Sequence, residues 1–576
     1  MDYRTAYESW LGDPAIDEGT KAELRGIAGN QKEIEDRFFR QLEFGTGGMR
    51  GVLGAGTNRL NIYTVRRAAQ GLANYILKSD DYRPGMGVAI AHDCRRMSPE
   101  FCREAALVLC ANGIKTYTWD SLRSTPELSF AVRHFGCISG IVITASHNPP
   151  EYNGFKVYWS DGGQCPYPRD EAIITEVNKI TSFDMVKTTS LEKAKADGLF
   201  AAAGRETDDA FVESVKSQSV WPDACPNSDI KIVFTPLYGA GYVPVLRVLR
   251  EKGFKNVYPE TRQAGPDGNF PTVAYPNPEA REAFALSLET AERHGADIII
   301  ATDPDSDRVG VAARHGGEFF FLNGNMTGVL LADYIISGKK AAGKLPKNGA
   351  IVSTIVSTRL TEALAKAAGL AYFDVLTGFK YVGEKIKEFQ AAGSHEFIFG
   401  FEESYGYLAG THARDKDAVV ASMLVCEAAA YYKEKGMTLV DALEAVYRVH
   451  GRFSEHVESI TLKGVDGLND IKRIMEGLRA APPKELGGSK VAIIRDYKNS
   501  EMKCARTGKT KKIELPVSDV MHFTMEDETW ACVRPSGTEP KIKLYYGAKL
   551  PAGASEKDAK AKLAKMSDDL KRHGMA

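Results

Sequence analysis

The chain has 576 residues, of which 43% are hydrophobic and 26% are charged, values that are ordinary for a globular protein and exclude a disordered or fibrous one. Its 74 Lys and Arg residues balance 75 Asp and Glu residues, so the net charge is −1 and no broad basic field favours nucleic acid or an anionic membrane. At roughly 150 residues per domain we expect about four domains, with ligands recognised at local sites.

The N-terminus and the cysteines indicate a reduced, cytoplasmic protein. Met1 leads into Asp2, Arg4 and Glu8 rather than into a basic stretch and an apolar core, and the sequence contains no apolar run of about 18 residues. The nine cysteines include no C-x-x-C pair. We therefore expect reduced cysteines, cytoplasmic localisation and neither secretion nor membrane insertion.

The predicted elements begin with a polar, amphipathic helical extension over residues 1–44. From residue 87 onward strands and helices alternate, which predicts a largely parallel sheet. The expected elements of this first round are strand 87–92, helix 99–112, strand 114–119, helix 125–135 and strand 140–144.

The same alternation returns twice, and the pattern then changes. The second round is strand 230–235, helices 243–249 and 278–294, and strand 297–301; the third is strand 351–354, helices 360–368 and 381–390, and strand 397–399. After about residue 450, strand-rich stretches surround a helix at 467–479 and a charged terminal helix near 555–573. We predict an α/β protein with three similar α/β domains and a C-terminal α+β domain. The expected boundaries are 1–44, 45–205, 206–320, 321–450 and 451–576.

A serine follows the last strand of the first round, in the segment from Thr144 to Pro150. Ligands usually bind where buried parallel strands end. Ser146 can act there as nucleophile or phosphoryl carrier if positive charge is close, and His147 and Lys156 are the candidates. The alternative is an ordinary turn with a hydrogen-bonded serine.

Three aspartates, Asp303, Asp305 and Asp307, alternate along the segment that follows the predicted strand 297–301. Converging oxygen ligands suit Mg²⁺, and three acids this close repel one another without a cation. A solvated acidic turn is the alternative. An EF-hand loop does not fit, because it would need glycine at 308 and glutamate at 314, where the chain has Arg308 and Arg314. A haloacid-dehalogenase-type aspartate nucleophile is also disfavoured, because Thr or Val would be expected at position 307, which is aspartate.

Two further polar loops occur in the later domains. Glu402 and Ser404 follow strand 397–399, and a carboxylate and a hydroxyl are suited to holding vicinal sugar hydroxyls. The segment from Arg534 to Lys541 combines arginine, hydroxyls and glycine, which favours a phosphate, although a hairpin turn has the same composition.

Together these loops resemble the signature loops of the α-D-phosphohexomutase superfamily, most closely its phosphoglucomutase branch, which includes longer relatives that act on phosphopentoses. The resembling segments are Thr144-Ala145-Ser146-His147-Asn148-Pro149, Asp303-Pro304-Asp305-Ser306-Asp307-Arg308, Glu402-Glu403-Ser404 and Arg534-Pro535-Ser536-Gly537-Thr538. The resemblance runs in order from about residue 40 to 550. It implies four domains around a central cleft, with one Mg²⁺ per chain held by phosphorylated Ser146 and Asp303, Asp305 and Asp307.

The resemblance also implies roles for individual residues. Arg50, Arg308 and Lys156 would surround the transferring phosphoryl group, and His147 or Lys416 would act as base. Thr377, Gly378 and Lys380 lie in a loop that senses sugar orientation, where phosphoglucomutases often have tryptophan in place of Phe379, so the preferred sugar stays open. Glu402 and Ser404 would bind sugar hydroxyls. The residues implied to grip the phosphate that is not transferred are Arg534, Ser536, Gly537 and Thr538.

The resulting expectation is a phosphoglucomutase that interconverts glucose 1-phosphate and glucose 6-phosphate through glucose 1,6-bisphosphate. The alternatives are the same chemistry on mannose or pentose phosphates, a bisphosphate synthase, a metal-dependent sugar phosphatase, and a non-catalytic sugar-phosphate-binding protein. We expect small phosphosugars as partners, neither nucleic acid nor membrane, and a monomer or weak homodimer.

Overall fold

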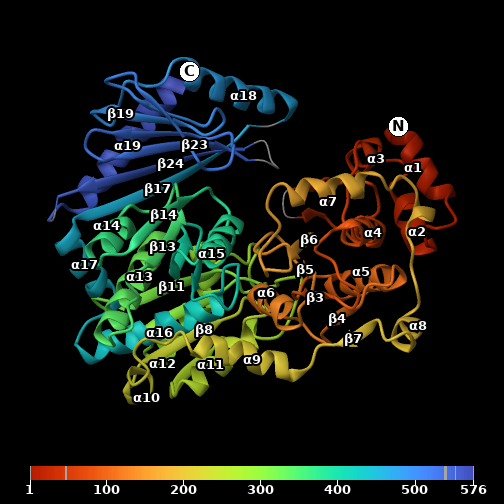
Figure 1. Cartoon of the computed structure of the whole chain (residues 1–576), viewed down its shortest axis with the longest axis horizontal. Coiled ribbons are helices and arrows are strands. Elements are labelled where there is room, and N and C mark those ends of the chain that lie inside the picture. The colour runs from red at the N-terminus through yellow and green to blue at the C-terminus, as the bar shows by residue number, and fades with distance from the viewer. Residues whose placement is uncertain (1, 46–47, 463, 537–540, 552, 575–576) are drawn as a thin grey trace. The chain divides into compact units, whose positions relative to one another are not determined.

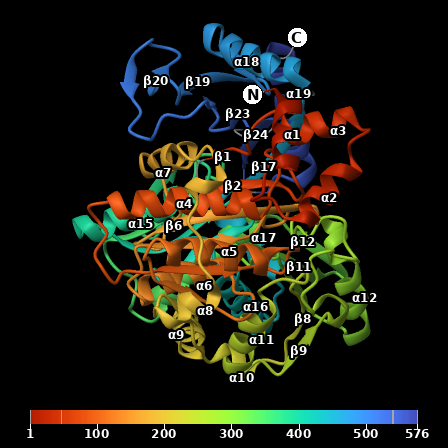
Figure 2. The ribbon, with the colours of Figure 1, turned by 90° about the vertical axis from the view of Figure 1, so that its right-hand side faces the viewer.

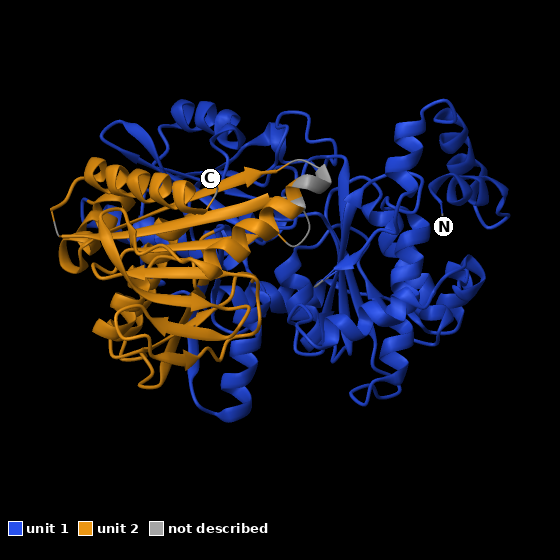
Figure 3. Ribbon diagram, turned by 90° about the horizontal axis from the view of Figure 1, so that it is seen from above, with its two compact units in different colours: residues 1–323, 379–400, 404–436 blue, residues 324–378, 401–403, 437–576 orange. Residues whose placement is uncertain are grey.

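The computed structural model describes residues 2–45, 48–462, 464–536, 541–551 and 553–574 (Figure 1). The chain forms two compact units, with residues 1–323, 379–400 and 404–436 in unit 1 and residues 324–378, 401–403 and 437–576 in unit 2 (Figure 3). Within the described chain, no helix is both long enough and apolar enough to cross a membrane. The boundaries expected between four domains stay a prediction.

The N-terminal extension is folded into three short helices: α1 (Tyr3–Gly12), α2 (Glu18–Gly26) and α3 (Gln31–Phe38). Asp17 caps α2 by accepting a hydrogen bond from the Thr20 N–H, and capping of this kind starts a helix at a defined residue. Trp10 packs edge-on against Phe38 and Tyr63, with ring centroids 5.7 and 5.4 Å away. This aromatic cluster attaches the extension to the first residues of helix α4 (Ile62–Lys78).

The first sheet has the strand order β1-β2-β6-β5-β3-β4-β7. Its strands are β1 (Phe44–Gly45), β2 (Gly48–Val52), β3 (Val88–His92), β4 (Thr116–Thr118), β5 (Ser139–Ile143), β6 (Tyr152–Trp159) and β7 (Phe200–Ala202). The helices are α4 (Ile62–Lys78), α5 (Ser98–Ala111), α6 (Thr125–His134), α7 (Arg169–Asn178) and α8 (Leu191–Ala196). The predicted parallel arrangement holds for β5, β3, β4 and β7, whereas β6, β2 and β1 are antiparallel. The short connection from β5 to β6 explains the reversal, because parallel strands need a long crossover.

Successive side chains of a strand point to opposite faces of its sheet, and both faces of this sheet are buried. On β3, Val88 and Ile90 belong to the core that contains side chains of α4 and α5, while Ala89 and Ala91 belong to the core that contains side chains of α6. Helices α4 and α5 lie side by side (Figure 2). The sheet is therefore a buried layer, and its polar loops emerge at the strand ends.

The rest of unit 1 contains a second sheet of order β12-β11-β10-β8-β9, in which β10, β8 and β9 are parallel and β10, β11 and β12 are antiparallel. The strands are β8 (Lys231–Thr235), β9 (Asn256–Pro259), β10 (Ile298–Thr302), β11 (Val309–His315) and β12 (Glu318–Leu322). The helices are α9 (Arg205–Lys216), α10 (Ala224–Asn227), α11 (Tyr242–Glu251), α12 (Ala285–His294), α15 (Lys380–Ala392) and α16 (Ala418–Glu434). Helix α12 begins later than the predicted residue 278. The Asn277 side chain accepts a hydrogen bond from the Glu279 N–H at 3.1 Å, and such a local turn competes with helix formation.

The third and fourth sheets complete the chain. The third has the order β14-β13-β15-β16, and the fourth is an antiparallel sheet of order β17-β24-β23-β22-β19-β20-β21, with β18 paired to β19. Strands of the third are β13 (Gly349–Thr354), β14 (Ala371–Val375), β15 (Glu396–Glu402) and β16 (Gly406–Ala409). Strands of the fourth are β17 (Arg452–Thr461), β18 (Glu485–Leu486), β19 (Ser489–Asp496), β20 (Glu501–Cys504), β21 (Thr510–Lys512), β22 (Met521–Met525), β23 (Trp530–Pro535) and β24 (Lys541–Leu550). The remaining helices are α13 (Gly324–Ala341), α14 (Leu360–Ala367), α17 (Leu439–His450), α18 (Gly464–Ala480) and α19 (Glu556–Gly574). The predicted fold class, three α/β domains followed by an α+β domain, is confirmed.

Candidate active site

Two of the polar loops are short connections between antiparallel strands within unit 1. Residues 144–151 join β5 to β6, and residues 303–308 join β10 to β11. Ser146 and Ser306 adopt positive φ angles of 51° and 55°, which non-glycine residues rarely do. Backbone strain of this kind persists where the surroundings hold it in place, and it is frequent at functional sites.

The Ser146 hydroxyl lies against the aspartate loop. Its side chain is 2% exposed, and Oγ donates to Asp303 Oδ2 at 2.7 Å. His147 Nδ1 lies 3.1 Å from Ser146 Oγ, and the Ser146 N–H donates to Thr144 Oγ1 at 2.8 Å. The structure therefore brings together a serine and an aspartate that are 157 positions apart in the sequence.

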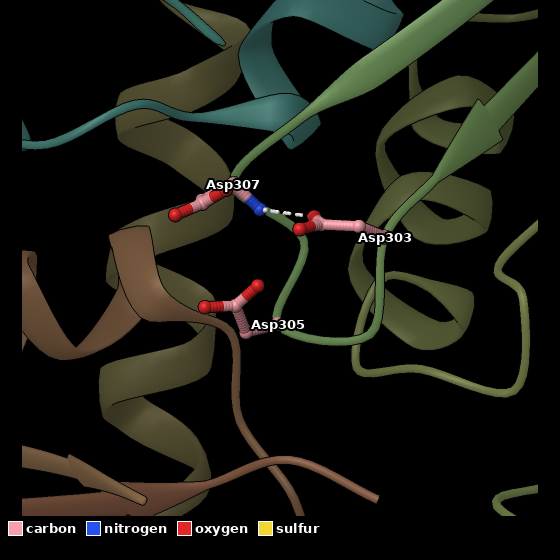
Figure 4. Close-up of side chains that lie close together, drawn as sticks. All are labelled: Asp303, Asp305 and Asp307. Carbon is pink, nitrogen blue, oxygen red and sulfur yellow. Dashed lines mark hydrogen bonds between the residues drawn. The ribbon is translucent and has the colours of Figure 1, made fainter. Parts of the chain in front are cut away.

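The three aspartates form one buried cluster (Figure 4). Asp303 and Asp305 are fully buried and Asp307 is 1% exposed, and one carboxylate oxygen from each lies within 4.8 Å of the others. Asp303 Oδ1 accepts hydrogen bonds from the N–H groups of Asp307 and Arg308, both at 3.0 Å. The loop thus folds around the first carboxylate and directs the other two toward the same space.

Two lysines compensate this negative charge. Lys156 Nζ on β6 lies 2.9 Å from Asp305 Oδ2, and Lys416 Nζ lies 3.0 Å from Asp307 Oδ2. Burial disfavours ionisation of Asp305, but the charge and hydrogen bond of Lys156, together with a hydrogen bond from Asp303 and the charge of Lys416, outweigh burial and lower the pKa of that carboxyl. Burial and the charges of Asp305 and Asp307 raise the pKa of Asp303 well above its usual range. The positive side chains of the protein therefore do not fully neutralise the negative charge of the three carboxylates.

The cluster has the donor set of a divalent-cation site. Among the described residues, Asp305 Oδ1 and Asp307 Oδ1 are buried oxygens without a hydrogen-bond partner. Buried polar atoms are normally satisfied, and an ion is one recognised explanation for an exception. Three carboxylates are hard oxygen ligands of the type that Mg²⁺ prefers, so the residues fit a magnesium ion.

The other predicted residues of the phosphoryl region also lie close to the serine loop. Arg50 on β2 donates to Asn148 Oδ1 at 3.0 Å, and β2 pairs with β6 so that Gly48 lies opposite Lys156. Arg308 donates to Glu279 Oε1 at 2.6 Å. Burial, together with the positive charges of Arg308 and Arg50, lowers the pKa of His147 well below its ordinary value, so its imidazole is neutral at pH 7.

The predicted substrate-binding residues of unit 2 form a second group. Arg534 on β23 donates to Thr377 Oγ1, and the Gly378 N–H donates to Glu402 Oε1 at 2.8 Å. The Ser536 N–H donates to the Lys541 carbonyl at 2.7 Å. The remaining two predicted residues, Gly537 and Thr538, lie outside the described residues.

Two predicted sugar-binding residues belong to unit 1. Lys380, the first residue of α15, lies with its Nζ 3.4 Å from Asp170 Oδ2, and that aspartate is 2% exposed. Ser404 lies in the short loop between β15 and β16. Sugar-binding roles for both stay proposals.

Several residues at these sites have no counterpart in the sequence prediction. Asp93 follows β3 and accepts from Thr144 Oγ1 at 2.6 Å, Thr125 donates to Asp305 Oδ2 at 3.0 Å, and Asp415 Oδ1 lies 3.3 Å from Lys416 Nζ. In unit 2, Glu403 Oε2 accepts from Thr354 Oγ1 at 3.0 Å. The sequence contained one indication for Asp93, which is a polar residue directly after a buried strand. That strand is parallel to β5, so Asp93 lies at the same edge of the sheet as Ser146.

Three family models match the chain in order. The model described as phosphoglucomutase/phosphomannomutase, alpha/beta/alpha domain I matches residues 41–184, that of domain II matches residues 209–317, and that of domain III matches residues 323–449. These matches contain the serine loop, the aspartate loop and the loop with Glu402.

Individual relatives give the same result. A phosphoglucomutase of Staphylococcus aureus (strain MRSA252) is 38% identical over 527 residues, which cover 90% of this chain and 92% of that protein. The open form of the Paramecium phosphoprotein pp63/parafusin, a phosphoglucomutase, has a TM-score of 0.67 at 18% identity and covers 93% of this chain and 96% of its own. An N-acetylphosphoglucosamine mutase of Aspergillus fumigatus, solved with GlcNAc-6P and magnesium, has a TM-score of 0.51 at 13% identity, covering 100% and 99%. The two solved structures share the fold.

Proposed function

Because this chain belongs to the phosphoglucomutase/phosphomannomutase family, we propose that it interconverts glucose 1-phosphate and glucose 6-phosphate through a phosphorylated Ser146. It is an isomerase of the phosphoglucomutase type, an intramolecular phosphotransferase. The observation that carries the mechanism is the 2.7 Å contact between Ser146 Oγ and Asp303 in a buried acidic cluster.

We assign one Mg²⁺ per chain to the aspartate cluster, with a phosphoryl oxygen on Ser146 completing the ligands. The carboxylate oxygens of Asp305 and Asp307 that lack a hydrogen-bond partner, and the chemistry of three carboxylates, support this assignment. When bound, the ion would neutralise charge that develops on the phosphoryl oxygens.

Phosphoryl transfer depends mainly on positioning and on stabilisation of charge. Ser146 would pass its phosphoryl group to the available hydroxyl of the sugar phosphate, with Arg50, Arg308 and Lys156 supplying positive charge. Neutral His147 is suited to accept the proton that Ser146 Oγ loses when it takes up a phosphoryl group, and to return that proton when the phosphoryl group leaves, since its Nδ1 lies 3.1 Å from Ser146 Oγ. Lys416 is the other candidate base. The resulting glucose 1,6-bisphosphate would reverse its orientation and return its other phosphoryl group to the serine.

Before it can return its other phosphoryl group, the intermediate must reverse its orientation. This requires a second binding site that holds the phosphate that is not reacting, whichever end of the sugar carries it. We assign the phosphate grip to the loop of Arg534, Ser536, Gly537 and Thr538. We assign contacts with the sugar hydroxyls to Glu402 and Ser404, and recognition of sugar orientation to the loop of Thr377, Gly378 and Lys380. The hydrogen bonds from Gly378 to Glu402 and from Arg534 to Thr377 support this assignment for the residues of unit 2, because they join Glu402 and Arg534 to the same short segment.

The preferred sugar is tested by measuring isomerisation of glucose, mannose and ribose 1-phosphates with Mg²⁺ and a trace of the cognate bisphosphate. We expect the highest kcat/KM for glucose 1-phosphate. A higher value for mannose or ribose 1-phosphate would reassign the substrate, and release of inorganic phosphate without isomer would indicate a phosphatase. We further propose small phosphosugars as the partners, a monomer or weak homodimer, and cytoplasmic localisation.

A further inference from the structure

We propose that Arg95 is a positioning residue for phosphoryl transfer, because its guanidinium group fixes the backbone of the loop that carries Ser146. Arg95 lies between β3 and α5 and is 1% exposed. The inference rests on the proposed function, in which Ser146 is the phosphoryl carrier.

The guanidinium group of Arg95 donates to four carbonyl groups of the serine loop. Nη2 donates to the Ser146 carbonyl at 2.6 Å and to the Asn148 carbonyl, and Nη1 donates to the carbonyls of Pro149 and Tyr152 at 2.8 and 3.0 Å. These acceptors span the connection from Ser146 to the first residue of β6. A single buried side chain therefore contacts the connection along most of its length.

Asp93 links the same arginine to the other side of the serine. Asp93 Oδ2 lies 3.4 Å from Arg95 Nε and accepts from Thr144 Oγ1 at 2.6 Å, and Thr144 Oγ1 in turn accepts from the Ser146 N–H at 2.8 Å. Asp93 Oδ1 accepts from the Arg95 N–H at 2.9 Å. Ser146 is thus held through its N–H and through its carbonyl by one connected network.

An aromatic ring covers the guanidinium group. The Phe270 ring centroid lies 5.0 Å from Arg95 Cζ, and Phe270 is 2% exposed. Stacking on an aromatic face is favourable for arginine and restricts its rotation. Arg95 is consequently fixed between Phe270 and the serine loop.

This network explains how Ser146 keeps its positive φ of 51° with Oγ directed at Asp303. An unfavourable backbone conformation persists when neighbouring groups determine it, and the four carbonyl contacts and the N–H contact do so here. In-line phosphoryl transfer is sensitive to displacement of the reacting oxygen, and a shift of about 1 Å can reduce the rate by about 10²-fold. Arg95 acts through the loop, since its Nη1 and Nη2 groups donate to backbone carbonyls.

The test compares Arg95→Lys with Arg96→Lys. Lysine keeps the positive charge but lacks the planar fork that reaches four carbonyls. Arg96 is a matched control, because it is exposed and donates to the neighbouring Pro150 carbonyl of the same connection at 3.0 Å. The measurements are kcat and KM for glucose 1-phosphate, and the rate at which glucose 1,6-bisphosphate phosphorylates Ser146, followed by intact mass.

For Arg95→Lys we expect kcat and the phosphorylation rate to fall by about 10²-fold with KM changed by less than about twofold, and for Arg96→Lys we expect all three to be unchanged. Unchanged kcat in a folded Arg95→Lys protein would overturn the proposal, as would an equal loss in the control. If Arg95→Lys does not fold, Phe270→Leu replaces it. That variant keeps the guanidinium group but removes its cover, so kcat should fall, and an unchanged kcat again overturns the proposal. Failure of the proposed function is distinguishable from failure of the Arg95 proposal. In that case the protein without any substitution would take up no phosphoryl group at Ser146.

Discussion

Replacing Lys156 by methionine tests whether the acidic cluster is held together by charge. Methionine keeps most of the apolar stem and removes the ammonium group, which lies 2.9 Å from Asp305 Oδ2 and 3.6 Å from Asp307 Oδ2. The side chain of Asp305 is fully buried and that of Asp307 is 2% exposed. The substitution leaves three carboxylates with Lys416 as the lysine in contact.

Removing one partner of a buried ion pair typically costs about 3–5 kcal/mol, because the remaining charge is left uncompensated. At about 2 °C per kcal/mol for a large domain, the first melting transition of the metal-free protein should fall by about 6–10 °C. Added Mg²⁺ should recover part of this loss, since an ion that binds the folded state stabilises it.

The assay is differential scanning calorimetry with chelator and with Mg²⁺, and Lys193→Met is the matched control. Lys193 Nζ lies 2.9 Å from Asp197, but the two side chains are 67% and 44% exposed, so its loss should cost less than about 1 kcal/mol. If both variants melt together in chelator, the cluster does not depend on Lys156 and this reasoning is refuted.

Four further outcomes are expected. Ser146→Ala should abolish isomerisation in a coupled assay while calorimetry shows an unchanged melting profile, and normal turnover would remove the serine mechanism. Arg534→Ala should raise KM for glucose 1-phosphate with a smaller change in kcat, and an unchanged KM would count against a phosphate grip. Chelation of divalent cations should abolish isomerisation and Mg²⁺ should restore it, whereas full activity in chelator would contradict the metal assignment. Burial raises the pKa of Glu455 from 4.5 to about 7, partly offset by a hydrogen bond from Thr358, so the folded chain keeps a proton that the unfolded chain loses. The free energy of unfolding should therefore fall, by no more than about 3 kcal/mol, as pH rises from about 4.5 to 7. Glu455→Gln should remove this pH dependence, which is measured by denaturant titration at pH 4.5 and 8.

Local sequence patterns predict much of the fold. Apolar runs such as 140–144 and 297–301 are strands because each is short, β-branched and bounded by polar residues, and the structure has β5 and β10 there. The same patterns do not give strand direction. The predicted parallel sheets overlook the antiparallel strands β6 and β11, since a segment's own residues do not specify which neighbour it pairs with.

The candidate site shows the same limit. Ser146 and the aspartates are visible in the sequence because each follows a buried strand, where ligands usually bind. The contacts that hold them come from distant segments: Thr125 and Asp305, for example, are 180 positions apart. Arg95 has the adjacent Arg96 beside it, and the sequence alone does not tell which of the two is buried.

The central claim is that Ser146 is the phosphoryl carrier, and peptide mass mapping tests it most directly. The protein is treated with Mg²⁺ and glucose 1,6-bisphosphate that carries labelled phosphoryl groups, digested and mapped, and a second sample is first chased with the unlabelled sugar-phosphate acceptor, glucose 1-phosphate. We predict one labelled phosphoryl group on the peptide that contains Ser146, and its loss to the acceptor during the chase. A phosphoryl group on another residue, or isomerisation by a protein that never carries one, would contradict the account.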